Sequence, residues 1–149
     1  MKTTVDPRTA PYAALLLRLS LGVMFLAHSV YLKLFVFTLP GTANFFGSLG
    51  LPPESAYLVF AAEAAGGLAL ILGFHTRTVA AILIPVLLGA TWAHSGNGWV
   101  FSADGGGWEY PLFLTVTAAV QALLGGGAYA LTNREPIIDV ILRHRDEAA

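Results

Sequence analysis

The chain has 149 residues, of which 56% are hydrophobic and only 11% are charged, against about 25% charged residues in a soluble domain. The net charge is −1 and no basic patch is interleaved with aromatic residues, which excludes a nucleic-acid-binding protein. The absence of cysteine excludes disulfides, thiol redox chemistry and centres held by cysteine, such as iron–sulfur clusters. The composition therefore predicts a single integral membrane domain over residues 1–149.

Four apolar segments are long enough to cross a bilayer as helices, for which about 17 to 25 residues suffice. They cover residues 11–37, 55–74, 78–94 and 110–131. None of them alternates polar and apolar residues with a period of two, so helices are indicated and strands are not. The first segment is longer than the apolar part of a signal peptide and contains charged residues, so we expect it to be retained. The predicted fold is an all-α, four-helix membrane bundle.

The two long connections are expected to lie at one membrane surface. Residues 38–54 are rich in aromatic residues, and we expect them in the interface with Phe45, Phe46 and Leu49 turned inward. Residues 95–109 are rich in glycine, which predicts a flexible loop, and Trp99 and Trp108 are typical interface anchors.

Shorter signals mark the remaining boundaries. Pro52, Pro53 and Glu54 suit the N-terminus of the second helix. Residues 75–77 predict a tight turn that makes the second and third spans antiparallel neighbours, and Pro85 is expected to kink the third span. After the fourth span, residues 135–145 predict a short helix on the membrane surface.

Lys and Arg gather on one side of the predicted bundle. Lys2 and Arg8 precede the first span, Arg77 lies between the second and third, and three arginines follow the fourth (Arg134, Arg143 and Arg145). The connections 38–54 and 95–109 contain neither Lys nor Arg. The positive-inside rule therefore predicts a multi-pass protein of the cell (inner) membrane with both termini in the cytoplasm.

Ionisable residues inside a membrane are costly and normally face the interior of the bundle. Arg18, Gly22, Ser29 and Lys33 form a stripe along the first span, and His28 lies about 100° from Ser29 around the helix. Glu63 stands alone in the apolar stretch "AAEAAGGLALILGF". Gly66 and Gly67, one turn later, would let another helix approach closely.

We expect Glu63 to pair with Arg18, Lys33 or a histidine. One interpretation is a buried ion pair that fixes the register of the helices. The other is a group that binds a ligand or exchanges protons.

Several polar residues converge on the predicted outer half of the bundle. The candidates for ligand binding or proton handling are Arg18, His28, Lys33, Glu63, His94, Glu109 and Tyr110. For His94 a bond to a loop carbonyl is the simpler interpretation, and Tyr110 is most simply an interface aromatic. The two histidines and two glutamates are possible metal ligands by type, but none has a diagnostic short spacing, so no metal site is predicted.

Four motifs in order resemble the DoxX family of small four-span bacterial membrane proteins. They are "LLLRLSLGVMFLAHSVYLK" (15–33), "FFGSLGLP" (45–52), "AEAAGGLALILGFHTR" (62–77) and "EYPLFL" (109–114). His28-Ser29 stands where the family often has His-Gly. The resemblance implies a link to quinone-dependent oxidation of sulfur compounds such as thiosulfate, which some relatives perform with a partner subunit. It also adds Arg77 to the positions of interest.

Two functions from different classes follow. The first is the membrane subunit of a quinone-linked redox system, in which His28 or Glu63 exchanges protons and Lys33 polarises a quinone oxygen. The electrons would come from a bound cofactor, another membrane subunit or a soluble redox partner.

The alternative is a structural or accessory subunit of a larger membrane complex, without catalysis of its own. It would pack through the small residues Ala61, Ala65, Ala69 and Gly73 and through "LLGGGAYAL". A small-molecule carrier is less favoured, since the chain shows no inverted repeat.

Overall fold

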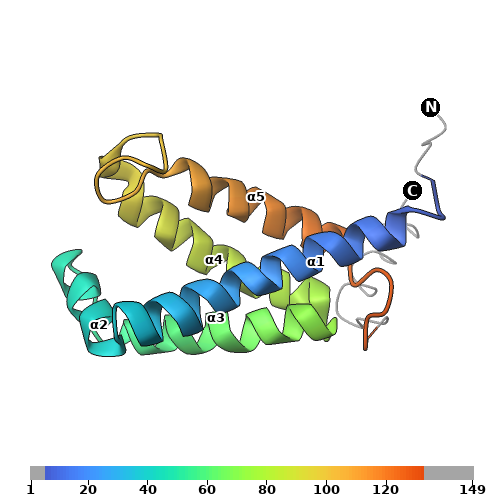
Figure 1. The fold of residues 1–149 in the computed structure, drawn as a ribbon, viewed down its shortest axis with the longest axis horizontal. Coiled ribbons are helices and arrows are strands. Elements are labelled where there is room, and N and C mark those ends of the chain that lie inside the picture. Colours follow the sequence, from blue (N-terminus) through green and yellow to red (C-terminus); the bar gives the residue numbers. More distant parts are fainter. Residues whose placement is uncertain (1–5, 133–149) are drawn as a thin grey trace, which may run out of the picture.

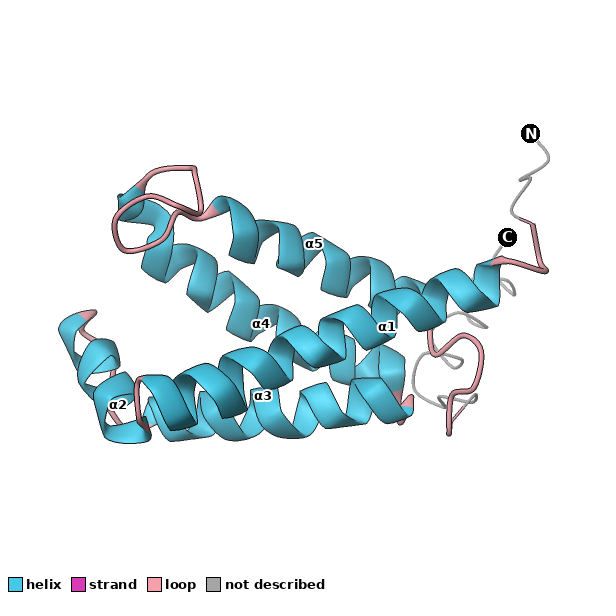
Figure 2. Cartoon of the chain, viewed as in Figure 1, coloured by secondary structure: helices cyan, strands magenta, loops and turns pink. Residues whose placement is uncertain are grey.

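The computed structural model describes residues 6–132. Every regular element in this range is a helix, and no strand occurs there (Figure 2). The elements are α1 (Ala10–Leu26), η1 (Ala27–Val36), α2 (Leu39–Ser48), α3 (Ser55–Leu72), α4 (Thr76–His94), η2 (Ser95–Asn97) and α5 (Glu109–Leu124). The all-α prediction is confirmed.

Three helical stretches are long and apolar enough to cross a membrane, namely Ala10–Val36, Ser55–Leu72 and Thr76–Asn97. They match the first three predicted spans. The fourth is a shorter apolar helix, α5, with 16 residues. At about 1.5 Å per residue it extends roughly 24 Å, somewhat less than a hydrocarbon core of about 30 Å.

The predicted end of the fourth span at Leu131 is wrong. Helix α5 stops at Leu124, because Gly125 and Gly127 adopt φ values of 84° and 69° and turn the chain out of the helix. The Gln121 side chain closes this end by donating to the Gly125 carbonyl at 2.7 Å. The glycines of this stretch therefore form a folded turn.

The long helices form two pairs that diverge. Helix α1 with η1 packs along α3, and α4 packs along α5. Figure 1 shows the pairs close together near the turn between α3 and α4 and spread apart at the opposite end, which carries α2 and the loop before α5. We call these the closed end and the open end. The core between the pairs contains Leu21, Phe25, Leu70, Ala80, Leu83, Leu87 and Ala118.

Glycine allows α1 and α3 to come into backbone contact. A Cβ atom added to Gly22 would lie 2.8 Å from the carbonyl oxygen of Gly67, and one added to Gly67 would lie 2.9 Å from that of Gly22. Gly66 faces the neighbouring helix instead, where a Cβ would meet the Leu83 side chain at 2.9 Å. The predicted close approach at these glycines is confirmed.

The second half of the first span is wound more widely than an α-helix. Element η1 is a π-helix, and at its end the Phe37 N–H donates to the Leu32 carbonyl five residues earlier, at 2.8 Å. The sequence-based stripe assumed α-helical spacing throughout. The wider winding changes which side chains of this segment share a face.

The connections mostly follow the predictions. Glu54 is the N-cap of α3, and the tight turn from Gly73 to His75 uses positive φ at both of these residues. Pro85 lies inside α4 without ending the helix, and the predicted kink there stays a prediction. The predicted surface helix over 135–145 lies outside the described residues.

The two long connections contain regular structure and internal contacts. Residues 38–54 contain α2, whose N-cap Thr38 accepts a hydrogen bond from the Gly41 N–H at 3.2 Å. The glycine-rich loop is tied at its base by a bond from the Trp108 N–H to the Gly98 carbonyl at 3.1 Å. Inside it the rings of Trp99 and Trp108 meet edge to face, with centroids 4.5 Å apart.

Candidate functional site

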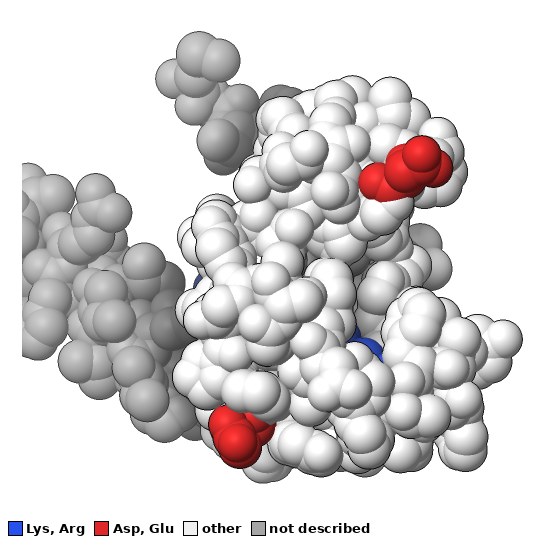
Figure 3. Space-filling view, turned by 90° about the vertical axis from the view of Figure 1, so that its left-hand side faces the viewer, with Lys and Arg blue, Asp and Glu red and all other residues white. Residues whose placement is uncertain are grey.

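A cavity of about 1110 Å³ lies at the open end. Its walls come from α1, η1, α2, α3, α4, the loop before α5 and α5 itself. Most lining residues are apolar, among them Leu21, Phe25, Leu32, Phe45, Phe46, Leu49, Val59, Val86, Ala90 and Leu114. Figure 3, which looks onto this end, shows an almost uncharged surface with a hollow between two lobes. Such a cavity has room for a ligand larger than most drug-sized molecules.

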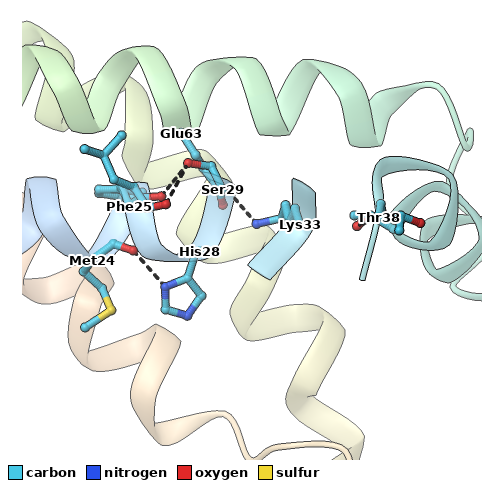
Figure 4. Close-up of polar contacts among 9 residues, drawn as sticks. Met24, Phe25, His28, Ser29, Lys33, Thr38 and Glu63 are labelled. Atoms are coloured by element: carbon cyan, nitrogen blue, oxygen red, sulfur yellow. Dashed lines mark hydrogen bonds and ion pairs between the residues drawn. The ribbon is translucent and has the colours of Figure 1, made fainter. Parts of the chain in front are cut away.

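An ion pair contributes charge to the cavity wall. The Lys33 ammonium, from η1, lies 2.5 Å from Oε2 of Glu63, from α3 (Figure 4). The side chains are only 17% and 8% exposed, respectively, and both line the cavity. Of the three kinds of partner predicted for Glu63, the one found in the structure is Lys33. Each charge offsets the cost of burying the other.

His28, Met24 and Tyr110 form a second polar group in the same cavity. His28 Nδ1 lies 2.9 Å from the carbonyl oxygen of Met24, one helical turn earlier (Figure 4). The His28 ring stacks on Tyr110, with centroids 6.1 Å apart and planes at 26°. The Tyr110 hydroxyl donates to the Met24 sulfur at 2.7 Å. Tyr110 thus joins α5 to the first span within the site.

The π-helical winding explains why His28 and Lys33 both reach the cavity. In an α-helix two residues five positions apart point about 140° away from each other. A π-helix bonds each residue to the one five positions away, so such residues return to nearly the same face. The cavity wall includes both side chains. Ser29, which the sequence placed on the stripe with Lys33, is fully buried and donates to the Phe25 carbonyl at 2.7 Å.

Two predicted site residues serve mainly to hold the loop before α5. His94 Nδ1 lies 3.0 Å from the Gly105 carbonyl, so the simpler interpretation of this histidine is confirmed, although it also lines the cavity. Glu109 accepts a hydrogen bond from the Phe101 N–H at 2.9 Å and does not line the cavity.

Arg18 lies at the closed end, away from the cavity. Its guanidinium donates to the carbonyls of Leu70 and Ile71, at the end of α3, and to that of Ala128, at 3.0 to 3.1 Å. The suggestion that Arg18 pairs with Glu63 is therefore wrong. Arg77 acts similarly at α5, where it donates to the Leu123 carbonyl at 2.8 Å. Both cations sit where the helix dipole is negative.

The predicted candidates thus separate into a site and its surroundings. His28, Lys33, Glu63, His94 and Tyr110 line one cavity, whereas Arg18, Arg77 and Glu109 stabilise the frame. Within residues 6–132 there is no group of three or more His, Asp or Glu side chains that could hold a metal ion.

Two parts of the site were missed at the sequence level. Met24 was not among the predicted site residues, because nothing in its neighbourhood predicts a contact with the distant Tyr110. Helix α2 was not predicted within residues 38–54, although Thr38 two residues before Pro40 is a recognisable helix start.

Comparisons with known proteins agree with the composition and fold. The sequence model of the DoxX family matches residues 13–96. A protein of Bacillus subtilis (strain 168), named "Putative oxidoreductase CatD", is 41% identical over 76 residues, which are 51% of this chain and 54% of that relative. The match thus spans about half the length of this curated relative. No solved structure is significantly similar.

Proposed function

Because this chain belongs to the DoxX family, we propose that it is the membrane subunit of a quinone-linked redox system and binds the quinone in the cavity at the open end. The family match over residues 13–96 includes His28, Lys33, Glu63 and His94. The B. subtilis relative carries the word oxidoreductase in its name, which supports a redox role.

The observation that carries the proposal is a buried ion pair in the wall of an apolar cavity. A quinone has a flat ring with two carbonyl acceptors and an apolar tail. Lys33 uses one ammonium hydrogen on Glu63, and an ammonium has two more to donate to a carbonyl. The cavity of about 1110 Å³ offers apolar contact for the ring and the first part of a tail.

The residues of the chain would bind and orient the ligand. Lys33 would hold and polarise one quinone oxygen, while Glu63 and His28 are placed to exchange protons with it. The apolar walls would keep bulk water from the ring. A bound quinone supplies the electron-carrying chemistry itself. Electrons would enter from a bound cofactor, another membrane subunit or a soluble redox partner.

We further propose that both termini lie in the cytoplasm of a cell (inner) membrane and that the open end faces the other side. Arg8 and Arg77 lie at the closed end, whereas the connections 38–54 and 95–109, at the open end, contain neither Lys nor Arg. The positive-inside rule supports this orientation. The cavity would then open in the outer leaflet, where a quinone can enter from the lipid.

The proposal is tested by purifying the full chain gently from native membranes and extracting bound lipids for mass spectrometry. We expect a quinone in wild type, and at least a fivefold lower yield in Glu63→Gln and Lys33→Met. Ser29→Ala is the matched control, because Ser29 is buried next to the site but does not line the cavity. A quinone yield that is equal in all four proteins, or absent from wild type, would contradict the proposal.

A second candidate is an accessory subunit that packs against other membrane proteins. Ala61 and Ala65 are exposed on the outer face of α3 together with Leu58, Leu68 and Leu72. Small residues on such a face favour close contact with another helix. In the other predicted packing surface, "LLGGGAYAL", Gly127 packs against Pro11 and Ala14 within the chain, whereas the large apolar side chains are exposed (Leu123, Leu124, Tyr129 and Leu131).

Substitutions on the outer face of α3 distinguish the quinone-binding function from the accessory one. Ala61→Leu with Ala65→Leu should release protein partners from the purified sample if α3 is a packing face, while leaving any bound quinone in place. Stable partners in wild type with no quinone would favour the accessory role.

A further inference from the structure

The hydrogen bond of His28 fixes which of its ring nitrogens carries the hydrogen. Nδ1 lies 2.9 Å from the Met24 carbonyl oxygen. A carbonyl oxygen can only accept, so Nδ1 must be the donor. In the neutral imidazole the other nitrogen, Nε2, then has a lone pair and no hydrogen. Met24 thereby sets His28 as a hydrogen-bond acceptor.

Nε2 is available to a ligand in the cavity. His28 lines the cavity, and among the described residues its ring makes no hydrogen bond other than the one at Nδ1. Figure 4 shows the second ring nitrogen on the side of the ring away from the Met24 carbonyl. This end of the site offers an acceptor without a hydrogen of its own.

Tyr110, like His28, offers a ligand only a hydrogen-bond acceptor. Its hydroxyl donates its single hydrogen to the Met24 sulfur, since a thioether has none to give. The remaining lone pair of the phenolic oxygen can only accept. His28 and Tyr110 stack on each other, so a ligand at this end meets two acceptors. A ligand carbonyl placed there would meet no donor, whereas a ligand hydroxyl could donate its hydrogen to one of these acceptors.

The Lys33–Glu63 pair does not discriminate in this way. Lys33 has hydrogens left to donate, and Oε1 of Glu63 has no partner among the described residues. The pair can therefore bind a carbonyl through Lys33 or a hydroxyl through Glu63. Any preference between the two oxidation states of a ligand must arise at the His28 end.

We propose that the His28 acceptor makes this cavity selective for ring hydroxyls, so that it binds a hydroquinone more tightly than the corresponding quinone. This selectivity rests on the proposed function, because it presupposes that the cavity takes a ligand of this class. His28 is then a specificity-determining residue, and Met24 positions it. A ligand hydroxyl left facing two acceptors gains a hydrogen bond that the carbonyl form lacks, which corresponds to about a tenfold difference in affinity.

The test compares two probes on the full-length protein in lipid nanodiscs under nitrogen. The probes are a benzoquinone with a decyl side chain and its reduced hydroquinone, titrated by calorimetry. We expect wild type to bind the hydroquinone about tenfold more tightly. In His28→Phe, which keeps an aromatic ring beside Tyr110, the ratio should fall to near one. Ser29→Ala removes a similar side-chain bond to a backbone carbonyl on the neighbouring residue and should keep the wild-type ratio.

Nitrogen-15 NMR of histidine-labelled protein gives a second readout, in which the protonation of each ring nitrogen is measured on wild type itself. The His28 signals, assigned by their loss in His28→Phe or by their response to the probes, should show hydrogen at Nδ1 and none at Nε2. Hydrogen at Nε2 would overturn the inference. Quinone bound as tightly as hydroquinone would also overturn it and would leave the proposed function standing. No binding of either probe would overturn both.

Discussion

Lys33 and Glu63 lie 30 positions apart in the sequence and form a direct ion pair at 2.5 Å across η1 and α3. The pair is part of the wall of the cavity at the open end, where both side chains are mostly shielded from solvent. It links the two helices toward the open end, as the contact between Gly22 and Gly67 links them deeper in the bundle. The same two residues thus contribute to the frame and to the site.

Removing one partner of this pair should destabilise the protein more than removing both. Lys33→Met and Glu63→Gln each leave the other group buried without its partner, which costs about 3 kcal/mol of unfolding free energy. The double variant Lys33→Met/Glu63→Gln should recover more than half of that loss, because no uncompensated charge remains. The unfolding free energies of wild type, the two single variants and the double variant are compared by thermal unfolding in one detergent. Strictly additive losses in the double variant would show that the two residues do not interact.

Adding a methyl group where α1 meets α3 should be costly. A Cβ at Gly22 would lie 2.6 Å from Cγ1 of Ile71 and 2.8 Å from the Gly67 oxygen, so the helices must move apart. Gly22→Ala and Gly67→Ala should each lower the unfolding free energy by about 1 to 3 kcal/mol. Gly89→Ala in α4 is the control, since no atom lies within 4 Å of its added Cβ. It should be neutral or slightly stabilising, because alanine favours helix. Equal effects at all three sites would argue against the close crossing.

Arg18 should be required for stability, with only partial replacement by lysine. Its guanidinium donates to three carbonyls from two separate segments, and it is 1% exposed. Arg18→Met leaves these carbonyls without that donor, with an expected loss on the order of 3 kcal/mol or more. Arg18→Lys keeps the charge but lacks the forked geometry, so it should recover only part of the loss. The exposed Arg8→Met should change stability by less than about 0.5 kcal/mol. Full rescue by lysine would mean that charge alone matters at this position.

The orientation can be tested with single cysteines, because the natural chain has none. Ser102→Cys lies in the exposed loop at the open end, and Arg8→Cys lies before α1 at the closed end. In intact cells whose inner membrane is sealed, a membrane-impermeant maleimide should label only Ser102→Cys. Arg8→Cys should react only after the membrane is permeabilised. The reverse labelling pattern would place both described ends on the opposite sides.

Local signals in the sequence were sufficient for the four long helices and most of their boundaries, but not for α2. Apolar length predicted the first three spans, and Pro52, Pro53 and Glu54 marked the start of α3. The end of α5 was missed, since hydropathy does not distinguish a helix from a turn made of Gly125 and Gly127. Glu63 was recognised as needing a partner, but three kinds of partner remained open.

The sequence by itself determined that this is an all-helical membrane protein with costly charges inside it, because hydropathy and segment length follow directly from residue order. Only the tertiary structure decided that Lys33 meets Glu63 and that Arg18 binds carbonyls at the closed end. Such pairings depend on the rotation and depth of each helix relative to its neighbours. The π-helical winding of η1 changed that rotation midway along the first span, and so brought His28 and Lys33 into one cavity.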